Sequence, residues 1–152
     1  MNNRVWLYVA VSIGSVACAA QQPLPSPDDG VACTAQLPIR IVKLVYVDVA
    51  PGQNGPVVSP ELCVVRSGTQ VVWRTALDVQ DPFALAFAES PVASANLRMS
   101  DKAAQKNFNS QRMGRRQEVQ IIAKPVTSEN LITYDVAIGP LHVDPGIKIM
   151  PR

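Results

Sequence analysis

The chain contains few of the residues and motifs on which enzyme active sites depend. Its 152 residues include a single histidine and three cysteines, and only 17% of them are charged. It has no Gly-x-Ser-x-Gly motif of a hydrolase nucleophile, and no glycine-rich loop of the kind that binds phosphate. The acidic pair Asp28–Asp29 lies in a proline-containing segment rather than beside a predicted pocket. We therefore expect no enzymatic activity.

The composition also excludes several classes of fold. Thirteen prolines and eight glycines are too many for a helical bundle, while 47% hydrophobic residues are too many for a disordered tail. The length suffices for one modest domain. The composition is therefore typical of a single globular domain that is rich in turns.

The N-terminus has the pattern of an export signal. Arg4 is followed by sixteen uncharged residues, 5–20, which are mostly apolar and end in small side chains. A membrane-spanning helix needs about 20 apolar residues, and the prolines and aspartates that follow do not extend the run. We predict a signal peptide over residues 1–17. The alternative is an uncleaved N-terminal anchor helix.

The end of this signal, Gly14-Ser15-Val16-Ala17-Cys18, resembles the lipobox of bacterial lipoproteins. The resemblance implies that Cys18 is lipidated and becomes the new N-terminus, with residues 18–37 as lipidated N-terminus and tether. Ala19 after that cysteine implies an outer-membrane lipoprotein on the periplasmic side of the cell envelope. Ala17-Cys18-Ala19 also fits the site of ordinary signal peptidase, which would remove Cys18 and leave a soluble periplasmic or secreted protein.

The two remaining cysteines, Cys33 and Cys63, form an even pair. An oxidising compartment would join them in a disulfide, and closing a loop of this size contributes about 3 to 4 kcal/mol in the chain-entropy model. Two unpaired buried thiols are the alternative. Neither cysteine has a second cysteine or histidine at short spacing, so a zinc site is not expected here.

From Pro38 onward the hydrophobic residues alternate with a period near two, which indicates strands. The first is one long strand, or two strands around a bend, whose alternate positions are β-branched: Ile39, Ile41, Val45, Val47 and Val49. Residues 61–66 and 69–74, joined by a Ser67-Gly68 turn, have the pattern of a hairpin. Further strands are predicted over residues 83–87, 119–123, 132–138 and 141–149, and one short helix from Ser100 to about Asn107.

This spacing of short strands and turns predicts an all-β fold, an antiparallel Greek-key-type β-sandwich of about seven strands with one short helix, over residues 38–152. The segments 61–73 and 134–149 are similar to the early Val-x-Trp strands and the last two strands of cupredoxins. This resemblance implies a cupredoxin-like sandwich.

The copper ligands of that family are missing from this chain. Type 1 copper is held by two histidines and a cysteine, usually with a weak axial methionine. By the resemblance, the first histidine would lie within residues 75–82, which contain none, and Ile138 stands where the cysteine would be. Only His142 falls on a ligand position. The sequence therefore predicts a cupredoxin-like domain without the type 1 copper ligands, and no cofactor.

His142 is the only imidazole in the chain, beside Asp144. We interpret it as an ordinary strand residue, because no partner for metal binding or catalysis is recognisable. The alternative is a periplasmic protein that handles copper through His142 with Met99, Met113 and Met150, since thioether ligands favour copper(I). A small hydrolase would instead need a concave pocket with a nucleophile beside His142.

Basic residues gather in one segment, residues 98–116. Its six basic residues and one acidic residue, Asp101, give a net charge of +5. We expect an exposed helix and loop that contacts an anionic polymer, lipid head groups or an acidic protein face; a solvated surface without a partner is the alternative. Nucleic acid is not expected, because the chain is exported and only Phe108 is available for stacking. The basic residues are Arg98, Lys102, Lys106, Arg112, Arg115 and Arg116.

Together these patterns predict an exported, lipid-anchored β-sandwich protein with a non-catalytic binding or structural accessory role. Its expected partner is a cell-envelope protein or an anionic envelope polymer, contacted through the basic segment or an open sheet edge. The membrane would be reached through the lipid at Cys18. Periplasmic copper handling is the alternative function.

Overall fold

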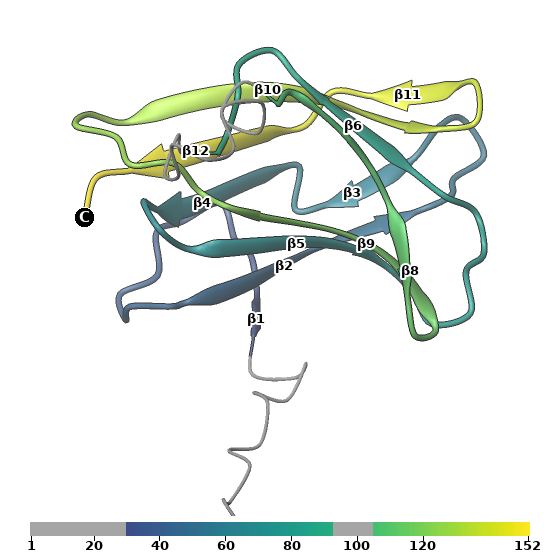
Figure 1. The fold of residues 1–152 in the computed structure, drawn as a ribbon, viewed down its shortest axis with the longest axis horizontal. Coiled ribbons are helices and arrows are strands. Elements are labelled where there is room, and N and C mark those ends of the chain that lie inside the picture. Colours follow the sequence, from purple (N-terminus) through teal and green to yellow (C-terminus); the bar gives the residue numbers. More distant parts are fainter. Residues whose placement is uncertain (1–29, 93–104) are drawn as a thin grey trace, which may run out of the picture.

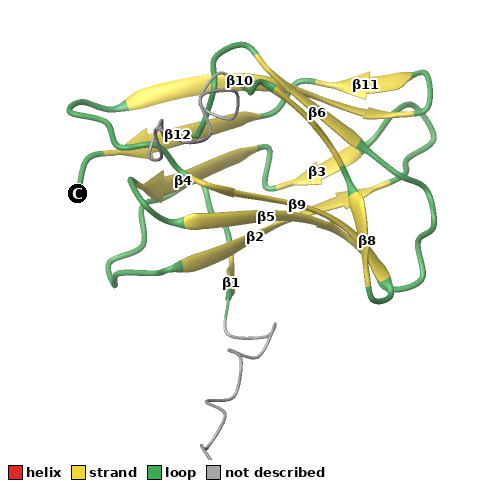
Figure 2. Ribbon diagram, in the orientation of Figure 1, coloured by secondary structure: helices red, strands yellow, loops and turns green. Residues whose placement is uncertain are grey.

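The computed structural model of the chain describes residues 30–92 and 105–152. Within these residues all regular structure is strand, and no helix is long or apolar enough to cross a membrane (Figures 1 and 2). The first sheet contains β1 (Val31–Ala32), β2 (Leu44–Ala50), β3 (Val57–Ser59), β5 (Gln70–Thr75), β8 (Gln111–Met113) and β9 (Arg116–Ile122). The second contains β4 (Leu62–Arg66), β6 (Ala84–Phe87), β7 (Asn107–Asn109), β10 (Asn130–Ile138), β11 (Leu141–Val143) and β12 (Gly146–Met150).

The two sheets face each other as a β-sandwich, so the predicted fold class is confirmed (Figure 2). The strand order is β1-β2-β5-β9-β8 in the first sheet, with β3 also beside β2. In the second sheet it is β4-β12-β10-β6-β7, with β11 also beside β10. The expectation of purely antiparallel sheets is wrong, because β2 pairs in parallel with β1 and β5, and β12 with β4. The β2–β5 pair runs in parallel because the chain passes through the second sheet, in β4, before it returns.

The expected hairpin of residues 61–66 and 69–74 is also wrong. β4 pairs with β12 in the second sheet, whereas β5 pairs with β2 and β9 in the first. The turn at Ser67 and Gly68 therefore carries the chain from one sheet to the other. Gly68 adopts a φ of 82°, which favours glycine. Its N–H donates to the Ala123 carbonyl, and that of Ser67 to the Met150 carbonyl, so each sheet holds one residue of the turn.

Other boundaries differ from the sequence prediction. The first long strand begins at Leu44, so Ile39 and Ile41, which the sequence placed in a strand, lie in the preceding loop and are 103% and 86% exposed. The predicted helix lies mostly outside the described residues, and its expected last residue, Asn107, is the first of β7. The described residues hold twelve strands rather than about seven, because several two- or three-residue strands at the sheet edges carry too little alternation to be recognised.

The core between the sheets centres on Trp73 of β5, which has no exposed surface. Its indole Nε1 donates a buried hydrogen bond of 2.9 Å to the Tyr134 hydroxyl on β10. Phe87 of β6 stacks on Tyr134 and meets Trp73 edge to face. Burial raises the pKa of the Tyr134 hydroxyl well above its ordinary value, so the group stays neutral and bonded. Aliphatic side chains fill the remaining space, among them Val45, Val47, Val71, Val136, Ile147 and Ile149.

One lateral edge of the sandwich is closed by the predicted disulfide, which the structure confirms. Cys33, directly after β1, bonds to Cys63 in β4, with Cα atoms 5.5 Å apart. The Cys33 N–H donates to the Tyr46 carbonyl of the first sheet, and the Val64 N–H of the second sheet donates to the Thr34 carbonyl. The folded domain thus begins before Pro38, in the segment that the sequence assigned to the tether.

The opposite lateral edge is closed by the chain itself. A single residue, Ser110, separates β7 in the second sheet from β8 in the first. Its N–H donates to the Phe83 carbonyl, and its hydroxyl accepts from the Phe83 N–H and donates to Gln117 of β9. Both edges of the sandwich are therefore linked between the sheets, one by sulfur and one by backbone.

Removing the disulfide tests how much the first link contributes. Because the cysteines are 30 residues apart in the chain, the Cys33→Ala/Cys63→Ala variant should lose about 3 to 4 kcal/mol of free energy of unfolding. Urea unfolding followed by the fluorescence of buried Trp73 measures this loss. The reduced native protein serves as the control and should lose a similar amount. A loss below about 1 kcal/mol in both would show that the edge is held without the bond.

Candidate functional site

The described part of the basic segment forms a hairpin at one end of the molecule (Figure 1). β8 and β9 pair antiparallel around a turn at Gly114, whose φ of 63° favours glycine. The loop after β5, residues 76–80, packs on this turn, because the Asp78 N–H donates to the Arg115 carbonyl. The hairpin and this loop together form what we call the hairpin tip, with Leu77, Asp78, Arg112, Met113 and Arg115 as its side chains.

Of the six basic residues in the segment, Arg98 and Lys102 lie outside the described residues. Lys106 donates to the Ala88 carbonyl near the opposite end of β6, so it is not part of the hairpin tip. Arg112, Arg115 and Arg116 lie together on the hairpin. Over residues 105–116 the expected helix and exposed loop are thus replaced by β7 and the β8–β9 hairpin.

The hairpin arginines are held by contacts within the domain. Arg112 donates to the side-chain oxygen of Gln80 at 2.6 Å and to the Gly114 carbonyl at 3.3 Å. Arg115 makes a two-pronged ion pair with Asp78, which raises the pKa of its guanidinium further. Asp78 itself adopts a φ of 66°, in the left-handed region that is uncommon for residues other than glycine. The ion pair and the Arg115 carbonyl therefore hold this loop residue from both sides.

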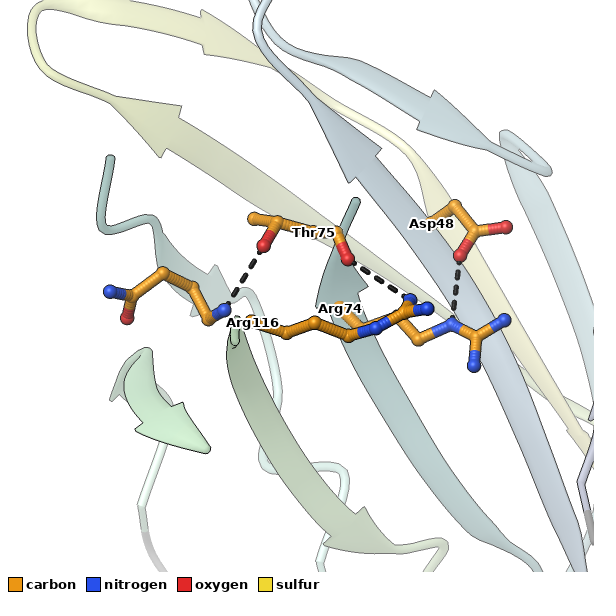
Figure 3. Close-up of polar contacts among 5 residues, drawn as sticks. Asp48, Arg74, Thr75 and Arg116 are labelled. Carbon is orange, nitrogen blue, oxygen red and sulfur yellow. Dashed lines mark hydrogen bonds and ion pairs between the residues drawn. The ribbon is translucent and has the colours of Figure 1, made fainter. Parts of the chain in front are cut away.

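Arg116 lies under the tip and joins β9 to β5 (Figure 3). Its guanidinium donates to the Thr75 carbonyl at 3.2 Å, while the Thr75 hydroxyl accepts from the Gln117 N–H at 3.0 Å. Gln117 also donates to the Gln80 carbonyl at 3.3 Å. Thr75 is fully buried and Gln117 nearly so. This polar cluster fixes the end of the sandwich beneath the hairpin tip.

A second ion pair lies on the outer face of the first sheet. Arg74 donates to Asp48 at 3.0 Å, between the neighbouring strands β5 and β2 (Figure 3). The same guanidinium lies 3.7 Å above the centre of the Tyr46 ring. The Asp48 carboxylate is 55% exposed, so this pair contributes little to stability on its own. Its effect is to cover Tyr46, which is only 6% exposed although it points away from the core.

The hairpin tip combines charge with exposed apolar surface. Leu77 is 53% exposed and Met113 is 52% exposed. Asp78 neutralises Arg115, while Arg112 has no carboxylate partner among the described residues, so a positive charge remains at the tip. Sequence reasoning identified the arginines and Met113 but missed Leu77, Asp78 and Gln80, which lie 30 or more residues earlier. No local pattern connects that loop to the hairpin.

His142 lies on β11, 56% exposed, and its Nδ1 is 2.8 Å from an Asp135 oxygen on β10. Sequence reasoning had placed Asp144 beside it instead. No group of three or more histidine, cysteine or acidic side chains within the described residues is arranged to hold a metal ion. Met113 and Met150 lie in different sheets, and Met99 falls outside the described residues. The structure thus does not bring together the donors that the copper alternative named.

No protein-family model and no curated protein sequence matches the chain. Among solved structures, that of auracyanin B, a cupredoxin, is similar to it with a TM-score of 0.37 and 14% sequence identity. The match covers 82% of this chain and 96% of that one. The β-sandwich itself rests on the strand pairings described above, and this similarity says nothing about activity or metal binding.

The polar cluster under the hairpin tip can be tested by removing one hydroxyl. Thr75→Val keeps the shape of the side chain but leaves the buried Gln117 N–H without its acceptor, which should cost about 1 to 3 kcal/mol of unfolding free energy. Thr133→Val on the exposed face of β10 is the matched control and should change stability by less than about 0.5 kcal/mol. Equal effects in urea unfolding would show that the Thr75 hydroxyl has no special role.

Proposed function

We propose that the protein is exported, lipid-anchored at Cys18, and serves as a non-catalytic binding domain that docks an acidic cell-envelope protein on its hairpin tip. The observation that carries this proposal is the exposed pair Leu77 and Met113 beside Arg112. Methionine and arginine are enriched in protein interfaces relative to other surface residues, and apolar side chains favour a protein over a charged polymer.

Export is supported by the Cys33–Cys63 disulfide, because such bonds persist in oxidising compartments and are rare in the cytoplasm. The apolar run over residues 5–20 and the lipobox resemblance at Cys18 support a signal peptide and an anchor. The anchor would attach the domain to the membrane. The folded part of this domain begins near residue 30, where β1 pairs with β2.

A binding role without catalysis is supported by how the domain uses its buried polar side chains. Four residues with polar side chains are buried in the described part of the chain, and each of these side chains hydrogen-bonds to a backbone group of another segment. One further buried hydroxyl, that of the half-buried Ser90, has no hydrogen-bond partner there. These four bonded side chains stabilise turns and strand ends, so their polar atoms are occupied by hydrogen bonds within the fold. The four are Ser67, Thr69, Thr75 and Gln117.

The anchor is tested by the intact mass of the protein purified from the envelope fraction. We expect a chain that begins at Cys18 and carries acyl groups, and a shift of the Cys18→Ser variant from the membrane to the soluble fraction. A free N-terminus after residue 18 would contradict the anchor and leave an exported soluble protein. The original N-terminus would contradict processing altogether.

The binding surface is tested with a photo-crosslinking amino acid at Met113 of the full chain, expressed in its source cells. We expect one acidic envelope protein to be captured there, and not from Leu131, which is 60% exposed on the other sheet. With that protein purified, Met113→Ala/Arg112→Ser should weaken binding by about 30-fold or more, as at interface hot spots.

Arg112→Lys is the matched control for this experiment. It keeps the positive charge and should retain most of the affinity, while native fluorescence of Trp73 verifies folding. The same protein captured from both positions, or none from Met113, would exclude the hairpin tip as the docking surface. If the domain instead bound an anionic polymer tightly and the double substitution abolished that binding, the partner would be a polymer and not a protein.

A further inference from the structure

The end of the sandwich opposite the hairpin tip carries two fully exposed isoleucines. Residues 38–43 form the loop that leads into β2, at the end of the molecule where the C-terminus also lies (Figure 1). In this loop Ile39 is 103% and Ile41 86% exposed, so both residues protrude into solvent. We call this loop the isoleucine loop. Such exposure of two neighbouring aliphatic side chains leaves apolar surface without cover.

Four basic residues surround the isoleucine loop. Arg40 and Lys43 belong to it, and Arg40 shares a surface recess with Arg66 at the end of β4. Arg152 reaches back to donate to the Ser67 carbonyl at 3.1 Å. None of the four has an ion pair among the described residues, whereas the nearby Lys124 and Lys148 pair with Glu89 and Glu129. The end of the domain thus combines an aliphatic protrusion with four cations that make no ion pair in the described part of the chain.

The N-terminal segment joins the domain on the same side. Gly30 lies against Leu44 and Tyr46, at the start of β2 and directly next to the isoleucine loop. The proposed lipid attachment site, Cys18, precedes Gly30 by twelve residues, which span at most about 40 Å even when fully extended. A lipid at Cys18 therefore keeps this end of the domain within reach of a bilayer surface.

We propose that the isoleucine loop docks on an anionic phospholipid surface. Ile39 and Ile41 would enter the head-group region, and Arg40, Lys43, Arg66 and Arg152 would lie at the level of the phosphates. Aliphatic side chains combined with cations are the composition of interfacial membrane contacts, and basic residues near an anionic bilayer add electrostatic attraction to it. This deepens the proposed function, because it orients the domain with its hairpin tip directed away from the bilayer.

The test uses the full chain as purified from the envelope, mixed with vesicles of phosphatidylcholine alone or with added phosphatidylglycerol. The readout is hydrogen–deuterium exchange of residues 38–43. No N–H from Ile39 to Lys43 donates a hydrogen bond within the described residues, so these amides exchange fast unless the loop is covered. We expect protection with the anionic vesicles only, weakened by salt, and none at residues 51–56, the loop after β2 at the other end.

Substitutions separate the apolar and the charged contributions. Ile39→Ser/Ile41→Ser should abolish the protection, and both side chains are so exposed that the fold should not change. Val57→Ser, at an exposed position of β3, is the matched control and should leave protection intact. Arg40→Ser/Lys43→Ser should lower the apparent affinity for anionic vesicles about 30-fold, since each cation near such a surface contributes roughly fivefold.

Equal exchange with both vesicle types, or protection of residues 51–56 instead, would overturn the lipid contact. Protection that arises only when a purified envelope protein is added would also overturn it and assign the loop to a protein partner. These outcomes can be told apart from a failure of the anchor. Intact mass shows whether Cys18 is acylated, and hydrogen exchange shows separately whether the isoleucine loop contacts lipid.

Discussion

The structure depends on keeping two sheets together that share no ladder of hydrogen bonds. Between them lies an apolar core that contains the buried hydrogen bond from Trp73 to Tyr134. A sandwich of this kind opens most easily at its lateral edges, where side chains have neighbours on one side only. Here both edges are linked, by the Cys33–Cys63 bond at one and by the passage through Ser110 at the other.

These links also determine where binding surfaces can lie. With its lateral edges joined, the sandwich presents to its surroundings mainly the outer faces of the sheets and the two ends. The outer face of the first sheet is partly covered by Arg74 over Tyr46. The ends differ in character: one holds arginines braced by Asp78 and Gln80, and the other holds cations without carboxylate partners around exposed isoleucines. Two ends with different chemistry suit a domain that bridges two different surfaces.

Alternating hydrophobic residues predicted the strands and the core, and the even cysteine pair predicted the disulfide. The pairing of strands was not predictable in the same way. The alternation along β4 and β5 is the same whether the two strands pair as a hairpin or lie in different sheets. Ile39 and Ile41 continue the alternation of β2, yet no strand lies beside them to pair with, so they protrude. For the site, the arginines were visible as a charge cluster. Their partners Asp78 and Gln80 were not, since they precede the arginines by 37 and 32 residues and only the fold brings them together.

The position of Cys33 has a mechanical consequence for a chain that would be held by its N-terminus. β1 pairs with β2 through only two residues, and a pull on the preceding segment would peel so short a strand away. The sulfur bond follows immediately and passes the load to Cys63 of β4, which pairs with Ile147 of β12. Tension on the anchor would thus be shared by both layers at once, and the domain would resist being drawn open from its point of attachment.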